Sequence, residues 1–527
     1  MTVDDALRTA PPAAEGGRAA VPAARTAAGA APPASAEAET AGSRPAGIET
    51  AAVAGQKTGA APVGPAAAGA ARRARVVLGV VCAAVFMSNL DLFIVNVAFP
   101  DIHRDLGGGL STLSWVLNGY AIAFAALLVP AGRLADRHGH RGGFLLGTAL
   151  FTAASALCAA SPGIVTLVIG RVAQAAGAAL LLPTSLALLL AATPPGRRAA
   201  AVRGWAAVGG LAAALGPVVG GLLVEADWRW VFLVNLPVGV ATLVVGARVL
   251  PRRREENPGP LPDVVGVLAL TAGIGLLALG LVESSNWGWG SAAVVGSLAG
   301  AVVLLAGFVA RSARHPAPVV ELSVLRSPGF SPAVAALFLF SVAFAAMLLS
   351  LVTYMDSAWG WSALKIGLAV TPGPAMVPPV ALLLAGRLVA RFGLGRVAGA
   401  GALIYAVGAG WWALRVGLHT HYAAGILPGM LLTGIGVGLV LPTLTAGATT
   451  VLPPARFATG SAVMNMSRQV ASVLGVAVLI AVVGAPARQH LVSAFHEGWW
   501  FVAATSLAAS VTAFVGLRSR RPAPASA

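Results

Sequence analysis

Apolar segments long enough to cross a lipid bilayer recur along most of the chain, from Val76 to Leu517. A membrane-spanning helix needs about 20 mainly apolar residues, because each residue adds about 1.5 Å across a hydrocarbon core about 30 Å thick. Only 10% of the residues are charged, against about 25% in soluble domains. Since lipid offers the backbone no hydrogen-bond partners, the sequence predicts an all-α membrane protein.

We predict fourteen spans, arranged as groups of six, two and six. Their approximate bounds are 76–99, 113–132, 143–160, 164–190, 200–223 and 229–249; then 263–283 and 291–310; then 330–355, 364–385, 396–415, 421–441, 457–483 and 497–517.

The placement of the basic residues agrees with the predicted spans. The net charge is +16, but most arginines lie in the N-terminal tail or in every second loop, which is a topogenic pattern and not a nucleic-acid surface. Arg72, Arg73 and Arg75 come directly before the first span. We therefore predict a multi-pass cell-membrane protein with both termini in the cytoplasm and no nucleic-acid partner.

An internal repeat relates the two groups of six spans. LLLPTSLALLLAATPPGR (180–197) resembles LVLPTLTAGATTVLPPAR (439–456). Pro183 matches Pro442 and Gly216 matches Gly475, and in both pairs the residue numbers differ by 259. Parallel repeats of six helices suit alternating access around a central site. The predicted domains are a disordered Ala/Pro-rich cytoplasmic tail (1–71), an N-terminal six-helix bundle (72–250), two linker helices (251–328), a C-terminal six-helix bundle (329–518) and a short cytoplasmic tail (519–527).

Asp91, inside the first span, is the leading candidate for function. A carboxylate at that depth costs roughly 2.5–3.5 kcal/mol on insertion scales. Arg171 lies inside the fourth span, and both residues are roughly 12–14 Å from the outer ends of their helices. They can meet directly, or water, Asn118 and Gln174 can intervene. We predict a proton-coupling pair; the alternatives are a packing hydrogen bond for Asp91 and a structural tie of Arg171 to backbone carbonyls.

Two motifs predict conformational roles. In GPVVGG (216–221) the proline bends a helix and the glycines allow a neighbouring helix to approach; ordinary small-residue packing is the alternative. In GRLADRHGHR (132–141) we expect Gly132 and Gly139 to make a tight turn and Asp136 to pair with arginines or a helix N-terminus; a solvated basic loop is the alternative. The candidate residues are Gly132, Arg133, Asp136, Arg137, Gly139, Arg141, Gly216, Pro217, Gly220 and Gly221.

Further polar residues are candidates for a substrate cavity or a second proton site. Asp356, at the outer end of the ninth span, is a possible second titrating group or a solvated loop acid. The predicted cavity residues are Trp115, Asn118, Tyr120, Gln174, Asn235, Arg468 and Gln469.

Enzyme and ATPase motifs are absent from the sequence. It contains no G-x-x-x-x-G-K-[ST], G-x-S-x-G or H-E-x-x-H, and its histidines have no metal-ligand spacing inside the predicted spans. We expect no enzyme, cofactor or metal, and a proton gradient as the energy source.

Together these motifs resemble the major facilitator superfamily. LDLFIVNVAFPDI (90–102), Trp115 with Tyr120, GRLADRHGHR, GRVAQAAGAALLLPTSL (170–186), GPVVGG and WRWVFLVNLPVG (228–239) occur in the order typical of its fourteen-span drug:proton antiporters of the EmrB/QacA type. The resemblance covers about 76–517. It implies two pseudo-symmetric six-helix bundles plus two extra helices, with Asp91, Arg171 and Asp136 at the family's functional positions. Ala390 in the second loop motif, and Asp356 near Tyr354, depart from the pattern.

The resemblance implies a proton-coupled antiporter that exports lipophilic drugs or antibiotics across a bacterial cytoplasmic membrane and works as a monomer. Its expected partners are the small-molecule substrate, protons and the lipid bilayer. Two alternatives stay open at this stage, namely an exporter dedicated to one secondary metabolite and a receptor or scaffold that does not transport.

Overall fold

The computed structural model describes residues 65–194, 198–251, 263–450, 452, 457–484 and 487–517. The predicted C-terminal tail and residues 1–64 of the predicted N-terminal tail lie outside these ranges, as do Arg197 and Arg456 of the repeat.

Fourteen helical segments of the described chain are long and apolar enough to span a membrane, as predicted. The first six consist of α1 (Pro65–Leu106), α2 (Leu110–His138), α3 (His140–Ala159), α4 (Ile164–Ala192), α5 (Arg198–Ala226), and α6 (Trp230–Leu233) with α7 (Asn235–Val249). The next two are α8 (Val264–Val282) and α10 (Ala292–Arg314), joined through α9 (Ser284–Trp287) and followed by α11 (Leu322–Leu325).

The last six spans begin with α12 (Phe330–Trp359) and a segmented tenth span of α13 (Ala363–Val370), α14 (Pro372–Pro379), the π-helix η2 (Val380–Ala385) and α15 (Gly386–Phe392). They continue with α16 (Leu394–Arg415), α17 (Tyr422–Thr450), α18 (Phe457–Val483) and, after the 3₁₀ turn η4 (Arg488–His490), α19 (Leu491–Gly516). Prolines at 372, 374, 378 and 379 explain the segmentation, since each removes a backbone donor.

Two expectations about helix ends were wrong. Residues 65–71, which we assigned to the N-terminal tail, belong to α1, because an alanine-rich stretch that starts with proline favours a helix. Gly132 does not make a turn: α2 continues to His138, and Gly132 packs beside Pro183 of α4. Gly139 does make the turn, with φ +100°.

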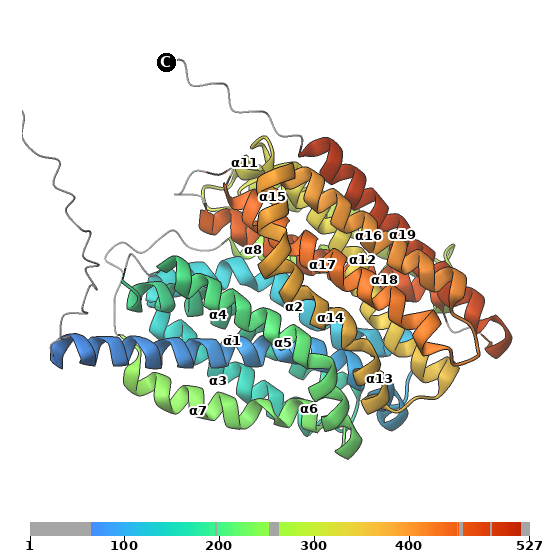
Figure 1. Ribbon diagram of the computed structural model, residues 1–527, viewed down its shortest axis with the longest axis horizontal. Coiled ribbons are helices and arrows are strands. Elements are labelled where there is room, and N and C mark those ends of the chain that lie inside the picture. Colours follow the sequence, from blue (N-terminus) through green and yellow to red (C-terminus); the bar gives the residue numbers. More distant parts are fainter. Residues whose placement is uncertain are drawn as a thin grey trace, which may run out of the picture. The chain divides into compact units, whose positions relative to one another are not determined.

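The two groups of six helices pack in the same pattern. In the first, α1 lies against α5 and α7, and α3 lies against α4 and α7; in the second, α12 lies against α18 and α19, and α16 lies against α17 and α19. The blue α1 beside α5, and α16 beside the red α19, can be followed in Figure 1. This correspondence is what the repeat in the sequence predicts.

A pair of glycines marks the same close crossing in both groups. A Cβ on Gly147 would lie 2.8 Å from the Gly177 carbonyl oxygen, and a Cβ on Gly401 would lie 3.2 Å from that of Gly436. The offsets are 401 − 147 = 254 and 436 − 177 = 259, the second equal to that of the sequence repeat. Backbones can approach this closely only where side chains are absent.

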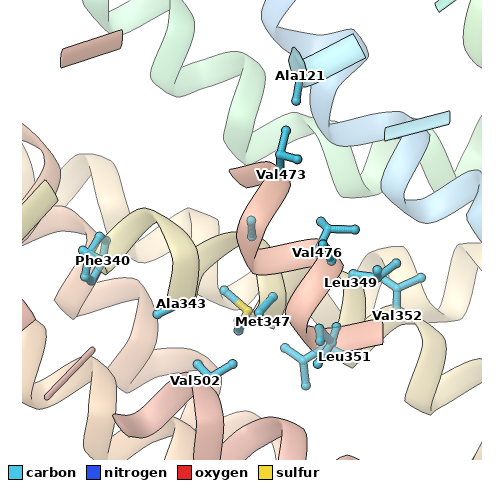
Figure 2. Packing of buried hydrophobic residues seen from close by; sticks show 14 of the residues in the cluster. Ala121, Phe340, Ala343, Met347, Leu349, Leu351, Val352, Val473, Val476 and Val502 are labelled. Carbon is cyan, nitrogen blue, oxygen red and sulfur yellow. The ribbon is translucent and has the colours of Figure 1, made fainter. Parts of the chain in front are cut away.

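The two groups meet where α2 packs on α18, where α5 packs on α13 and α14, and where α1 packs on α12 and α13. Figure 2 shows Ala121 of α2 directed at Val473 of α18, above a cluster that includes Met347 of α12 and Val502 of α19. The α8–α10 hairpin packs through α8 on both α2 and α18. The two additional spans therefore lie against the junction of the two bundles.

Candidate functional site

Asp91 and Arg171 form a buried ion pair inside the first bundle. Arg171 Nη1 lies 2.5 Å from Asp91 Oδ2, and the side chains are 0% and 1% exposed. The structure thus brings together the two residues that helix depth suggested. Arg171 Nε also donates to the Val116 carbonyl oxygen at 3.2 Å, so the backbone tie that we considered as an alternative is present as well.

Polar side chains from three further positions complete the network around this pair. Gln174 Oε1 accepts from Arg171 Nη1 at 2.6 Å, and Gln174 Nε2 donates to Asp91 Oδ1 and to Ser155 Oγ, both at 2.8 Å. Asn235 Nδ2 donates to Asp91 Oδ1 at 3.1 Å. A buried charge is stable only when its hydrogen bonds are satisfied, and here α1, α3, α4 and α7 each supply a partner.

Two aromatic rings lie beside the guanidinium of Arg171. The guanidinium carbon of Arg171 lies 4.2 Å from the Tyr120 ring centroid and 5.9 Å from that of Phe232. Tyr120 is 1% exposed and Phe232 is 0% exposed. Both rings therefore shield the ion pair while offering it a favourable cation–π contact.

The spacing of the helices explains why these residues meet. Arg171 and Gln174 are three residues apart, so they share one face of α4. Ser155 on α3 reaches the same point because Gly147 and Gly177 let α3 and α4 approach closely. Of the polar side chains in this network, the sequence had missed only Ser155, since a lone serine in an apolar span carries no distinguishing pattern.

A second set of charged contacts lies where α1 ends, on the predicted outer side. Arg104 Nη1 lies 3.0 Å from Asp356 Oδ1 of α12, and Arg104 Nη2 lies 2.6 Å from Asp101 Oδ1. Asp356, which we considered either as a titrating group or as a solvated acid, therefore joins the two bundles. Asp105 accepts from Trp228 Nε1 and from Arg229 Nη1 at 2.8 and 2.9 Å, which ties α1 to the start of α6.

The glycines of GPVVGG contact two different helices. A Cβ on Gly220 would lie 3.1 Å from Cα of Ile94 in α1, and one on Gly221 would lie 2.8 Å from Cα of Leu364 in α13. A Cβ on Gly367 of α13 would in turn overlap the carbonyl oxygen of Pro217. The predicted close approach of helices is therefore present, and the contact between α5 and α13 joins the two bundles.

The GRLADRHGHR motif, on the predicted inner side, contacts other parts of the chain at several points. Arg133 donates to the carbonyl oxygens of Ala317 and Pro318, both at 2.8 Å, between α10 and α11. Arg141 donates to the Ala247 carbonyl oxygen at 2.5 Å, and Asp136 Oδ1 lies 3.6 Å from His140 Nε2. The loop is therefore tied to the segment that follows the two additional spans, a contact that the sequence did not reveal.

The predicted cavity residues fall into two groups. Tyr120, Gln174 and Asn235 contact the ion pair and are at most 1% exposed, so in this structure they are enclosed and do not line an open cavity. Asn118 is 1% exposed, and neither its Oδ1 nor its Nδ2 has a hydrogen-bond partner among the described residues. Trp115 on α2, and Arg468 and Gln469 on α18, are only partly buried.

Within the described ranges, no three His, Cys, Asp or Glu side chains are grouped as metal ligands. What this site can do chemically is hold one carboxylate against one guanidinium in surroundings of low polarity.

Comparison with known proteins identifies the family. The profile of the Major Facilitator Superfamily matches residues 81–476, and the chain therefore belongs to that superfamily of membrane transporters. It is not an enzyme, and its relatives place it among the drug efflux transporters.

Several named relatives cover most of this chain. It is 36% identical to a probable actinorhodin transporter of Streptomyces coelicolor over 416 residues, which are 76% of this chain and 71% of the relative. It is 34% identical over 401 residues to a tetracenomycin C resistance and export protein of Streptomyces glaucescens, with 76% and 74% coverage. The multidrug resistance protein Stp of Mycobacterium tuberculosis is 34% identical over 404 residues, with the same coverage.

Solved structures confirm the fold. A point mutant of a POT peptide transporter, in complex with sulfate, superposes with a TM-score of 0.62 at 18% identity, covering 83% of this chain and 93% of that one. An auto-inhibited POT family peptide transporter gives a TM-score of 0.61 at 16% identity, with 85% and 98% coverage.

Proposed function

We propose that this protein is a proton-coupled antiporter that exports lipophilic drugs or antibiotics across a bacterial cytoplasmic membrane by alternating access. Protons entering from outside neutralise Asp91, and their release inside restores the ion pair with Arg171. The relatives named above support export as the direction of transport. The proton as coupling ion is supported by the residues themselves.

The single observation that carries the proposal is the buried Asp91–Arg171 pair. Apolar residues of similar volume would often stabilise the bundle as well or better, so a buried pair in a membrane helix calls for a functional reason. The carboxylate accepts from Arg171, Gln174 and Asn235. Protonation of Asp91 would weaken all three bonds together, which couples one proton to the packing of α1, α4 and α7.

Contacts between the bundles support alternating access. On the predicted outer side the bundles are joined by Arg104 with Asp356 and by Pro217 with Gly367. These contacts close that side, and they must separate for a substrate to leave outward. The glycines at the α5–α13 crossing let the helices part and rejoin without interlocked side chains.

For substrate recognition we propose Asn118. It lies three residues before Ala121, which faces α18 (Figure 2), so the two residues share one side of α2. A buried amide without partners costs about 1–3 kcal/mol. A substrate carrying a hydrogen-bonding group would recover that cost, and an Asn118→Leu variant should bind such a substrate more weakly.

The test is dye efflux from vesicles that contain the purified protein, driven by an imposed pH gradient. Asp91→Asn should abolish gradient-driven efflux while leaving downhill exchange measurable. The matched control is Glu225→Gln, which removes the same charge from an exposed position at the end of α5 and should transport like the wild type. Gradient-driven efflux by Asp91→Asn at the wild-type rate would remove the proposed role of this acid.

A second candidate function is export of one dedicated metabolite. Two of the relatives above are named for a single antibiotic, actinorhodin or tetracenomycin C, whereas another is named for multidrug resistance. Growth of cells with and without the protein on a panel of unrelated toxic compounds separates the two. Protection against one chemical class alone would favour the dedicated exporter.

A further inference from the structure

A pocket of about 420 Å³ lies at the end of α10, outside the ion-pair site and outside the junction of the bundles. Its walls come from the last two turns of α10 and the residues that follow, namely Gly307, Ala310, Arg311, Arg314, His315 and Pro316. Half of these six are basic side chains, and the glycine and alanine leave the floor open.

The basic groups of the pocket are not all engaged. Arg311 Nε donates to Asp263 Oδ1 at 2.7 Å, so its charge is balanced. Arg314 is exposed, and in the part of the chain that the structure describes its guanidinium has no hydrogen-bond or ion-pair partner. Its five donors are available to an anion.

His315 adds a ring N–H donor. Its Nδ1 accepts from the backbone N–H of Ala317 at 3.1 Å, which assigns the ring proton to Nε2. Arg133 holds the same segment from the other side through the Ala317 and Pro318 carbonyl oxygens. Asp263, which caps α8 by accepting from the Gly266 N–H, fixes Arg311. The pocket itself is lined by the end of α10 and the two residues after it. Arg133 and Asp263 hold that segment and Arg311 in place.

The position of the pocket on α10 indicates that lipid surrounds it in a membrane. On the side of α10 that carries Gly307, Ala310 and Arg314, the residues that precede the pocket are apolar and exposed, namely Ala299, Val303 (70% exposed) and Ala306. Such a face is covered by lipid chains in a membrane. Arg311 and Arg314 lie in the last turn, at the predicted inner surface, which is the level of the phospholipid headgroups.

We propose that this pocket binds the phosphate of an anionic phospholipid of the inner leaflet, with the acyl chains along the exposed face of α10. The guanidinium of Arg314 matches the oxygens of a phosphate diester, and Nε2 of His315 donates to the same group. Basic side chains at the cytoplasmic end of a membrane helix attract anionic headgroups. A free phosphate ion offers the same oxygens but gains nothing from the apolar face.

The experiment is native mass spectrometry of the full chain, released from detergent with added phosphatidylglycerol or with phosphatidylcholine of the same acyl chains. The affinity for the first bound lipid is measured for wild type, Arg314→Gln and the control Arg248→Gln. Arg248 is an exposed arginine in the last turn of α7, outside the pocket, at the same predicted surface. Both substitutions are at exposed positions, and an unchanged melting temperature confirms folding.

We expect phosphatidylglycerol to bind wild type and Arg248→Gln equally, and Arg314→Gln about fivefold more weakly, the loss of one basic side chain near the membrane surface. Phosphatidylcholine affinity should be the same in all three proteins, and inorganic phosphate should not displace phosphatidylglycerol. Equal affinities in wild type and Arg314→Gln, an equal loss in the two variants, or complete displacement by inorganic phosphate would each overturn the proposal. None of these measurements depends on transport.

Discussion

Arg104 Nη1 of α1 lies 3.0 Å from Asp356 Oδ1 of α12, and this ion pair joins the two bundles on the predicted outer side. Asp356→Asn removes the pair without changing side-chain size. Because pairs exposed to water contribute about 0–1 kcal/mol, we expect the population with parted outer ends to rise by up to about fivefold.

That population can be measured with a single cysteine, Ala363→Cys, in a chain whose native cysteines Cys82 and Cys158 are replaced by serine. Ala363 is 7% exposed and lies beside Gly221, so a membrane-impermeant maleimide reaches it only after the ends separate. The control is Asp227→Asn, which affects an ion pair inside the first bundle (Arg229 Nη1 to Asp227 Oδ1, 3.6 Å). Equal labelling of both variants would argue against an interbundle role for Asp356.

The stability of the buried pair should depend on charge balance. Arg171→Gln leaves Asp91 buried without its cation, and removal of one partner of such a pair costs about 3–5 kcal/mol. The double variant Asp91→Asn/Arg171→Gln has no buried charge, so it should recover most of that loss in a thermal-stability assay. It should nevertheless fail in gradient-driven efflux. If the double variant is less stable than Arg171→Gln alone, the pair is not coupled as the distances indicate.

The crossing of α5 and α13 should not tolerate one added methyl group. A Cβ on Gly367 overlaps the Pro217 carbonyl oxygen, whereas a Cβ on Gly210 of α5 meets no atom within 4 Å. Either Gly→Ala change should favour the helix by roughly 1 kcal/mol, so the comparison isolates the contact. Gly367→Ala should lose about 1–3 kcal/mol through overpacking and transport slowly. Gly210→Ala should keep the wild-type efflux rate and melt at the wild-type temperature or slightly above it.

Asp263 should make the stability of the protein depend on pH in the acidic range. Burial raises the pKa of this carboxyl, but the Gly266 N–H and the Arg311 guanidinium outweigh that effect, so the pKa lies below its usual 3.8. A group with a lowered pKa stabilises the fold above its unfolded pKa and loses that contribution as pH falls through the folded pKa. Wild type should therefore lose stability more steeply than Asp263→Asn below about pH 4.

The asparagine in that variant still caps α8, so the difference reports the charge and not the cap. Melting temperatures of both proteins between neutral pH and the acid range provide the measurement. Parallel curves for the two proteins would contradict the predicted contribution of Asp263.

Much of the fold could be predicted from the sequence because each spanning helix satisfies its own backbone. Length and hydropathy alone therefore set the fourteen spans, and the offset of 259 between Pro183 and Pro442 indicated the duplication. The bounds at Pro65 and Gly132 were less predictable, since alanine-rich and basic segments continue a helix beyond its apolar part.

The sequence by itself determined that Asp91 and Arg171 lie at matching depth, because depth follows from residue count along each helix. Only the tertiary structure decided which side chains meet across helices. Rotation about each helix axis and the glycine crossings brought Asn235 to Asp91 and Ser155 to Gln174, and they placed Arg104 beside Asp356. The same holds for Arg133 and Asp263, whose partners lie 184 and 48 residues away along the chain, since no local pattern encodes such distant contacts.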